Sequence, residues 1–203
     1  MKETNLTPLR ILIVDDSLSM RELLQALLEA MGITDVIHAK NGEEGLQRFY
    51  ETRPDIIITD GAMGPMDGYE LTDRIRTNPD NPNPYVPIIM LSGYLGTKQI
   101  EKARAKGVTE YLGKPVSSIT LYERIIEIIG NPYYFIRTPT YLGPDRRRET
   151  GDLHRGAERR TSDAIAATGR AATGRAATGR AATEGKVRSD LSGNAFNVFR
   201  SYE

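Results

Sequence analysis

Residues 11–17 read ILIVDDS, a continuous apolar run that ends in two carboxylates and a serine. A run that is apolar at every position is typical of a strand buried on both faces of a parallel sheet. Ser17 is a suitable N-cap for the helix that we expect next, because apolar residues recur at helical spacing over 18–31. The stretch therefore predicts a strand-to-helix unit with acidic residues at its turn.

The alternation of strand and helix continues to about residue 130. We expect strands at residues 11–14, 36–39, 56–59, 87–91 and 110–112. We expect helices at residues 18–31, 42–52, 67–77, 97–106 and 117–129. Five such units within about 120 residues predict an α/β fold, in which helices cover both faces of a parallel sheet.

The charge of the chain changes sign between its two halves. Residues 1–130 hold 14 basic and 19 acidic side chains, whereas residues 131–203 hold 13 basic and 8 acidic ones. Only about 14% of the second half is Leu, Ile, Val or Phe, too little to bury a core. Its AATGR repeats, at 166–183, are typical of a flexible spacer. We therefore expect a flexible N-terminus (1–8), a folded domain (9–130) and a basic, mostly disordered tail (131–203) with an arginine-rich segment (141–160).

The composition excludes several kinds of site. The chain has no Cys, which excludes disulfides, thiolate metal sites and a cysteine nucleophile. Its two histidines, His38 and His154, are far apart, so we expect no His-based zinc site. No apolar run approaches the roughly 18 residues that suggest a membrane span, and residues 1–8 do not read as a secretory signal. We expect a cytoplasmic protein.

Polar side chains follow the expected strands and should gather at one edge of the sheet. Asp15 and Asp16 follow the first strand, Asp60 the third, Ser92 the fourth and Lys114 the fifth. In open parallel sheets, ligands bind beyond the carboxyl ends of the strands. Three carboxylates in one cleft repel one another unless a cation lies among them, and all-oxygen ligation suits Mg²⁺. Such a site can bind a phosphoryl group carried on a carboxylate, with Asp60 as the nucleophile.

These residues lie in motifs that resemble the CheY-like receiver domains of response regulators. The matching motifs are ILIVDDS (11–17), IIITD (56–60), MDGYEL (66–71), MLSG (90–93) and YLGKP (111–115). The resemblance covers residues 9–130. It implies a flavodoxin-like (βα)5 fold, doubly wound, with strand order 2-1-3-4-5.

The resemblance also implies roles for the acidic residues in a two-component phosphorelay. Asp60 is expected to accept a phosphoryl group from a sensor histidine kinase or a phosphotransferase. Asp16 and Asp60, with the backbone carbonyl of Ala62, are expected to bind Mg²⁺ directly, and Asp15 through water. Mg²⁺-dependent self-phosphorylation and slow hydrolysis are the only chemistry expected, so we do not expect a stand-alone enzyme.

The same resemblance predicts a two-state switch. Ser92 is expected to turn toward the phosphoryl group, and Tyr111 to swing inward behind it. The Lys114–Pro115 peptide bond is expected to be cis, which aims Lys114 into the cleft. An output protein is expected to read the switch at residues 94–129.

Three positions depart from the family pattern. Gly64 stands where the family usually has Pro, and Pro65 follows it. Ala62 and Tyr94 occupy positions that tune the lifetime of the phosphoryl group. A small Ala opens the site to water, whereas a large Tyr shields it, and the sequence leaves open which effect is larger.

The arginine-rich segment is a second candidate site. Guanidinium groups suit phosphates and the O6/N7 edge of guanine, and interleaved acids can accept hydrogen bonds from guanine. The candidate ligand-binding residues are Tyr141, Asp145, Arg146, Arg147, Arg148, Asp152, Arg155, Arg159 and Arg160. The GPDRRR core resembles the tail of the CheY-like cyclic di-GMP effectors (Cle proteins), which act at the flagellar motor in chemotaxis. This resemblance implies cyclic di-GMP as a ligand and the motor switch as a partner. The alternatives are a tail that binds nucleic acid or an acidic protein, and a tail that is inert or docks on the acidic domain.

Overall fold

The computed structural model describes most of the first 146 residues of the chain. The described residues are 6, 8–94, 96–131, 133–138 and 140–146, together with the backbone of 185–188. The strands are β1 (Arg10–Val14), β2 (Asp35–Ala39), β3 (Ile56–Asp60), β4 (Ile88–Ser92), β5 (Glu110–Gly113), β6 (Tyr134–Thr138), β7 (Tyr141–Pro144) and β8 (Gly185–Arg188). The helices are α1 (Leu18–Ala30), α2 (Gly42–Thr52), α3 (Gly68–Thr77), α4 (Thr97–Ala105) and α5 (Ser118–Gly130). Every strand and helix predicted before residue 130 is present.

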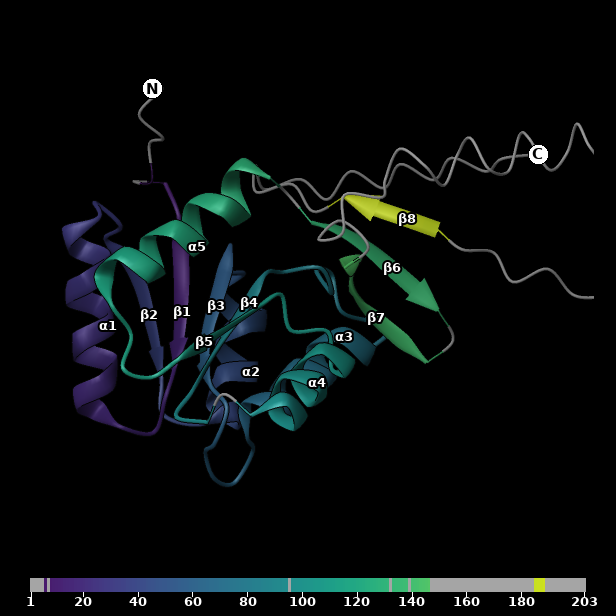
Figure 1. The fold of residues 1–203 in the computed structure, drawn as a ribbon, viewed down its shortest axis with the longest axis horizontal. Helices are drawn as coiled ribbons and strands as arrows, with labels where there is room; N and C mark the ends of the chain where they lie inside the picture. Colours follow the sequence, from purple (N-terminus) through teal and green to yellow (C-terminus); the bar gives the residue numbers. More distant parts are fainter. Residues whose placement is uncertain are drawn as a thin grey trace, which may run out of the picture. The chain divides into compact units, whose positions relative to one another are not determined.

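The first five strands form one parallel sheet in the order β2-β1-β3-β4-β5 (Figure 1). β1 lies between β2 and β3, so that Ile13 pairs with His38 on one side and Ile58 on the other. The predicted doubly wound fold and strand order are confirmed. Because the strands are parallel, the residues that follow them meet at one edge of the sheet.

Helices cover both faces of this sheet, and β1 contributes to both layers of the core. Ile13 packs with Leu28 of α1 and Ile125 of α5 on one face. Leu12, whose side chain points the other way, packs with Phe49 of α2 on the opposite face. The predicted burial of both faces is therefore present, and the sheet is a rigid base for the residues at its edge.

Side-chain caps fix the starts of four helices. The side chains of Ser17, Asn41, Asp67 and Ser117 each accept a hydrogen bond from the backbone N–H three residues further on. α4 follows Gly96 and has no such side-chain bond. The start of α4, which belongs to the predicted readout region, lacks the anchor that the other helices have.

An antiparallel hairpin follows α5, where the sequence analysis predicts disorder. β6 pairs with β7 between Phe135 and Pro144, and β8 pairs with the other edge of β6. The structure thus describes ordered chain at the start of the segment that the sequence analysis assigns to a mostly disordered tail. Composition averaged over the whole tail hides a short stretch rich in Tyr, Phe and Ile, which favour strands. Phe135 of this stretch is buried against Arg76 of α3, so the hairpin does not need a core of its own.

No helix among the described residues is long and apolar enough to cross a membrane.

Candidate functional site

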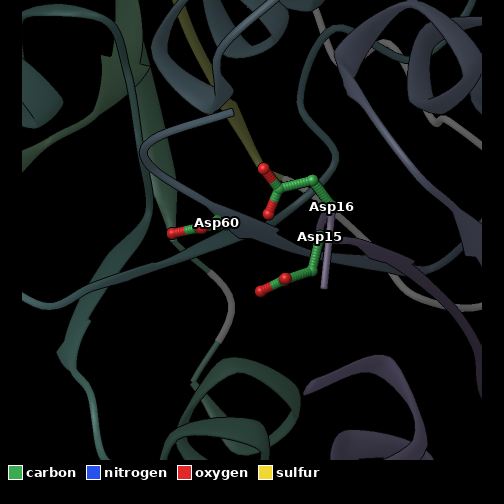
Figure 2. A group of neighbouring side chains, drawn as sticks. All are labelled: Asp15, Asp16 and Asp60. Carbon is green, nitrogen blue, oxygen red and sulfur yellow. The ribbon is translucent and has the colours of Figure 1, made fainter. Parts of the chain in front are cut away.

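Three carboxylates meet at the carboxyl edge of the sheet, as the sequence predicts. Asp15 and Asp16 follow β1, and Asp60 ends β3. β1 and β3 are hydrogen-bonded neighbours, which places the three side chains together (Figure 2). One carboxylate oxygen from each residue lies within 4.8 Å of the others. The result is a compact cluster of oxygen ligands.

Lys114 joins this cluster from the end of β5. Its Nζ lies 2.9 Å from Asp15 Oδ2 and 3.1 Å from Asp60 Oδ2. The backbone N–H of Lys114 donates to the carbonyl of Ser92 at 2.8 Å, which fixes the loop beside β4. The peptide bond from Lys114 to Pro115 is cis, as predicted. The ammonium group therefore bridges two of the three acids.

Asp15 is held more firmly than the other two acids. Its side chain is 1% exposed, and its Oδ1 accepts a hydrogen bond from the Ser17 N–H at 2.9 Å. Arg21 of α1 donates to the Asp15 carbonyl oxygen at 2.6 Å. Asp16 is exposed, and the Asp60 side chain is 12% exposed. The cluster thus has a buried base and an open side toward solvent.

The electrostatics of the site oppose the ionisation of Asp60. Burial raises the pKa of the Asp60 carboxyl, and the charge of Asp15 raises it further, against the lowering effects of Lys114 and of the Ala62 backbone N–H. Burial lowers the pKa of Lys114, but its hydrogen bonds to Asp15 and Asp60 outweigh this and the pKa is raised. One ammonium group therefore does not fully compensate the acids around it.

The donor set fits Mg²⁺. All three side chains offer hard oxygen ligands, and the excess of negative charge is what a divalent cation would neutralise. Asp15, Asp16 and Asp60 would hold the ion. Ala62, the fourth predicted ligand through its carbonyl, lies two residues after Asp60 in an exposed loop.

The predicted switch residues Ser92 and Tyr111 both form hydrogen bonds with Tyr94. Ser92 Oγ accepts a hydrogen bond from the Tyr94 N–H at 3.1 Å. The Tyr111 hydroxyl donates to the Tyr94 carbonyl at 2.8 Å, and its ring packs against a cluster that contains Tyr69 and Met90. Both side chains therefore engage the loop between β4 and α4. The Tyr94 side chain is 73% exposed and does not cover the site.

Sequence analysis misses two residues that position Asp60. A Cβ on Gly68 would overlap the carbonyl oxygen of Asp60, so only glycine allows α3 to begin this close to β3. The Thr59 hydroxyl donates to the same carbonyl at 3.1 Å. The glycine lies in the MDGYEL motif, which could have suggested a close approach. The adjacent departure from the family pattern, Gly64–Pro65, is a cis peptide bond.

The arginine-rich candidate site is described only at its beginning. Tyr141 and Pro144 lie in β7, where the Tyr141 hydroxyl donates to the Pro144 carbonyl at 3.3 Å. Asp145 is buried and Arg146 partly so. The remaining predicted residues lie outside the described part of the chain: Arg147, Arg148, Asp152, Arg155, Arg159 and Arg160. The cyclic di-GMP hypothesis stays a prediction.

The chain matches the family described as "Response regulator receiver domain" over residues 11–126. Because this match spans more than half of the sequence, the chain belongs to that family. Its fold and its acidic edge are thus those of the receiver domain of a two-component response regulator.

Similar proteins support the same assignment. Chemotaxis protein CheY1 of Helicobacter pylori is 32% identical over 124 residues, which cover 60% of this chain and 98% of that protein. Response regulator protein VraR of Staphylococcus saprophyticus is 27% identical over 72% of this chain and 69% of that protein. The structure of chemotaxis protein CheY4 of Vibrio cholerae has a TM-score of 0.55 and 30% identity, covering 59% of this chain and 98% of that one. The two chemotaxis proteins are covered almost completely.

Proposed function

We propose that this chain is a phosphorylation-driven switch that accepts a phosphoryl group on Asp60. The observation that carries the proposal is the group of three carboxylates within 4.8 Å, with Lys114 Nζ between Asp15 and Asp60. The proposed donor is a sensor histidine kinase or a phosphotransferase, and small acyl phosphates can replace it in the test tube.

In the proposed reaction, a carboxylate oxygen of Asp60 attacks the phosphorus atom of the donor. The bond from phosphorus to the leaving group breaks, the leaving group departs with the electron pair, and an acyl phosphate remains on Asp60. Mg²⁺, when bound, supplies positive charge to the phosphoryl oxygens. Lys114 already lies 3.1 Å from Asp60 and supplies a second positive charge without reorganisation.

The proposed output is a change in the protein-binding face formed by α4, β5 and α5. A phosphoryl group on Asp60 offers new acceptors to Ser92 and Lys114, and a Ser92 that turns toward it gives up its bond to Tyr94. Tyr111 is bonded to the same residue, so the two side chains share one loop. The proposed partner is an output protein, such as a flagellar motor switch protein, and similarity to chemotaxis protein CheY1 supports a role in chemotaxis.

The test is phosphoryl transfer from acetyl phosphate to the full chain, followed by intact-mass measurement. We expect one phosphoryl group on the wild type with Mg²⁺, and none after chelation with EDTA or in Asp60→Asn. Asp80→Asn, in the exposed loop between α3 and β4, is the matched control and should be labelled like the wild type. Phosphoryl incorporation into Asp60→Asn would overturn the assignment.

A second function is proposed for the tail, namely binding of cyclic di-GMP through the arginine-rich segment. What supports it is the GPDRRR sequence itself, whose first two residues, Gly143 and Pro144, end strand β7. Calorimetric titration of cyclic di-GMP into the full chain should show binding, with a triple Arg146–Arg148→Ala variant as the negative control. Equal heats for both proteins would reject this function and leave the alternatives of an inert tail or another acidic partner.

A further inference from the structure

The hairpin after α5 covers a buried cation at the end of the sheet opposite the acidic site. Arg76, near the end of α3, is 3% exposed and donates to the carbonyl oxygens of Gly107 (3.0 Å), Pro84 (2.7 Å) and Val86 (2.8 Å). Phe135 of β6 places its ring centroid 5.2 Å from the guanidinium carbon. These acceptors are neutral, so the aromatic face of the hairpin contributes to the stabilisation of the buried charge.

A second contact joins the hairpin to the end of α4. Gly107, which follows α4, has a φ of 82°, and a Cβ there would overlap the carbonyl oxygen of Leu142 on β7. A Cβ on Gly143 would lie 2.8 Å from the Gly107 Cα. The two backbones approach each other so closely that glycine is needed on both sides. A shift at the end of α4 cannot leave β7 unchanged.

The connector before β6 is fastened to β5. The Tyr133 hydroxyl donates to a carboxylate oxygen of Glu110, and Arg124 of α5 lies 3.7 Å from the other oxygen of this carboxylate. Burial raises the pKa of Tyr133, and its bond to Glu110 raises it further, so the hydroxyl keeps its proton. The hairpin is therefore anchored to α3, α4 and β5 at the same time.

One layer of packed side chains separates these anchors from the switch residue Tyr111. Its ring packs on a cluster that contains Ala103 of α4 and Val108. Val108 is adjacent to Gly107, whose neighbour across the contact is Leu142. A change in the position of Tyr111 thus has a continuous path of contacts to the hairpin.

We propose that the packing of the hairpin of residues 134–144 is coupled to the state of the receiver switch. The inference rests on the proposed function, because the change it transmits is the one that phosphorylation of Asp60 causes around Tyr111 and α4. In one state of the switch the contacts at Arg76 and Gly107 hold the hairpin tightly, and in the other they hold it less tightly. The receiver switch and the hairpin then influence each other through these contacts.

The test is hydrogen exchange of the full chain, followed by mass spectrometry of peptides that cover residues 134–144. Exchange is compared with and without acetyl phosphate and Mg²⁺, and intact mass is recorded in parallel. We expect phosphorylation to change the exchange rate of these amides by about fivefold or more, at the low end of allosteric couplings. Unlabelled protein would refute the proposed function, whereas labelled protein with unchanged hairpin exchange would refute the coupling alone.

A pair of glycine variants isolates the contact. Gly107→Ala places a methyl group against the Leu142 carbonyl oxygen and the Arg76 side chain, both part of the hairpin contact, whereas Gly32→Ala, with a similar φ of 84°, meets no atom within 4 Å. Both carry the backbone strain of a positive φ, so their difference reports the hairpin contact. The change in hairpin exchange on phosphorylation should be lost in Gly107→Ala and retained in Gly32→Ala.

Phe135→Leu provides a second disruption if Gly107→Ala does not fold. It removes the ring from Arg76 without burying a new polar group. We expect it to incorporate the phosphoryl group normally and to lose the change in hairpin exchange. An unaltered change in either variant would overturn the coupling.

Discussion

Lys114 and Arg76 are cations near opposite ends of the same parallel sheet, and their surroundings differ in kind. Lys114 is 20% exposed and lies between the carboxylates of Asp15 and Asp60. Arg76 is buried and donates hydrogen bonds to three neutral carbonyl oxygens, with an aromatic ring alongside. Around Lys114, the carboxylates outnumber the cation and the site is open to solvent. Around Arg76, carbonyl dipoles satisfy the single charge, and the side chain is shielded from solvent.

Lys114 is therefore available for chemistry, whereas Arg76 stabilises the fold. A ligand such as Mg²⁺ or a phosphoryl group can relieve the repulsion at the acidic edge, so binding there is favourable. At Arg76 a ligand would have to replace good hydrogen bonds in a desolvated place, which is costly.

The largest expected effect is on phosphoryl transfer when Lys114 is replaced. Lys114→Met removes the charge nearest to Asp60 and should slow incorporation from acetyl phosphate by about 10²–10³-fold, the cost of losing one preorganised donor. Initial rates at saturating Mg²⁺ provide the measurement. Lys98→Met, an exposed position on α4, should stay within about twofold of the wild type. A similar loss in both variants would contradict a specific role for Lys114.

Arg76→Met should give the largest loss of stability. Three carbonyl oxygens lose their donor, and the free energy of unfolding should fall by about 3 kcal/mol. Urea denaturation measures this value. The neighbouring Arg74, paired with Glu70 on the exposed face of α3, is the matched control, and Arg74→Met should cost about 0.5 kcal/mol or less. Equal values for the two variants would mean that burial of Arg76 contributes nothing specific.

Adjacent residues of β6 test whether the hairpin belongs to the folded domain. Phe135, 1% exposed, also makes an edge-to-face contact with Tyr85. Phe135→Leu should therefore lower the free energy of unfolding by about 1.5 kcal/mol. Tyr134, 39% exposed, should tolerate Tyr134→Leu with a change of about 0.5 kcal/mol or less. If urea denaturation gives no difference between them, the hairpin is not part of the cooperative unit.

The smallest expected effect concerns the buried charge of Asp60 at the acidic edge, and here the substitution should stabilise the protein. Asp60→Asn without Mg²⁺ should raise the free energy of unfolding by about 1 kcal/mol at neutral pH, because it removes a charge that is disfavoured first by burial and then by the nearby charge of Asp15. The pKa of Asp60 is raised from its ordinary 3.8. Ionisation of Asp60 therefore lowers the free energy of unfolding once the pH rises above 3.8. Below pH 3.8 the carboxyl is protonated in both the folded and the unfolded chain, so the gain from Asn should disappear.

Thermal unfolding in EDTA at neutral and acidic pH measures this gain. Asp73→Asn is the contrasting control, because Asp73 is paired with Lys106 at 3.1 Å and its loss should be slightly destabilising. A destabilised Asp60→Asn at neutral pH would show that the Lys114 bridge outweighs the repulsion.

Much of the fold and of the candidate site could be predicted from sequence. Continuous apolar runs marked the buried strands, and polar residues directly after them marked the edge where parallel strands end. This pattern alone predicts that Asp15, Asp16, Asp60 and Lys114 lie together. The roles of Gly68 and Thr59 could not be predicted, because they depend on how closely α3 approaches β3.

The hairpin was not predicted, for a related reason. Its residues Tyr134–Thr138 favour a strand locally, but they lie in a tail whose composition as a whole favours disorder. Order there depends on Arg76 and Gly107, which are 58 and 27 residues away from Tyr134 along the chain. Periodicity does not report such distant partners.

Local patterns therefore determined which segments are strands and helices, where the sheet ends and which acids gather there. Each of these follows from burial and hydrogen bonding within a few residues of the chain. Tertiary structure alone decided which side of Asp15 meets Lys114, where Tyr111 packs and why the chain after α5 stays folded. Those outcomes depend on side chains that only the completed sheet brings into contact, and on the desolvation that follows from that contact.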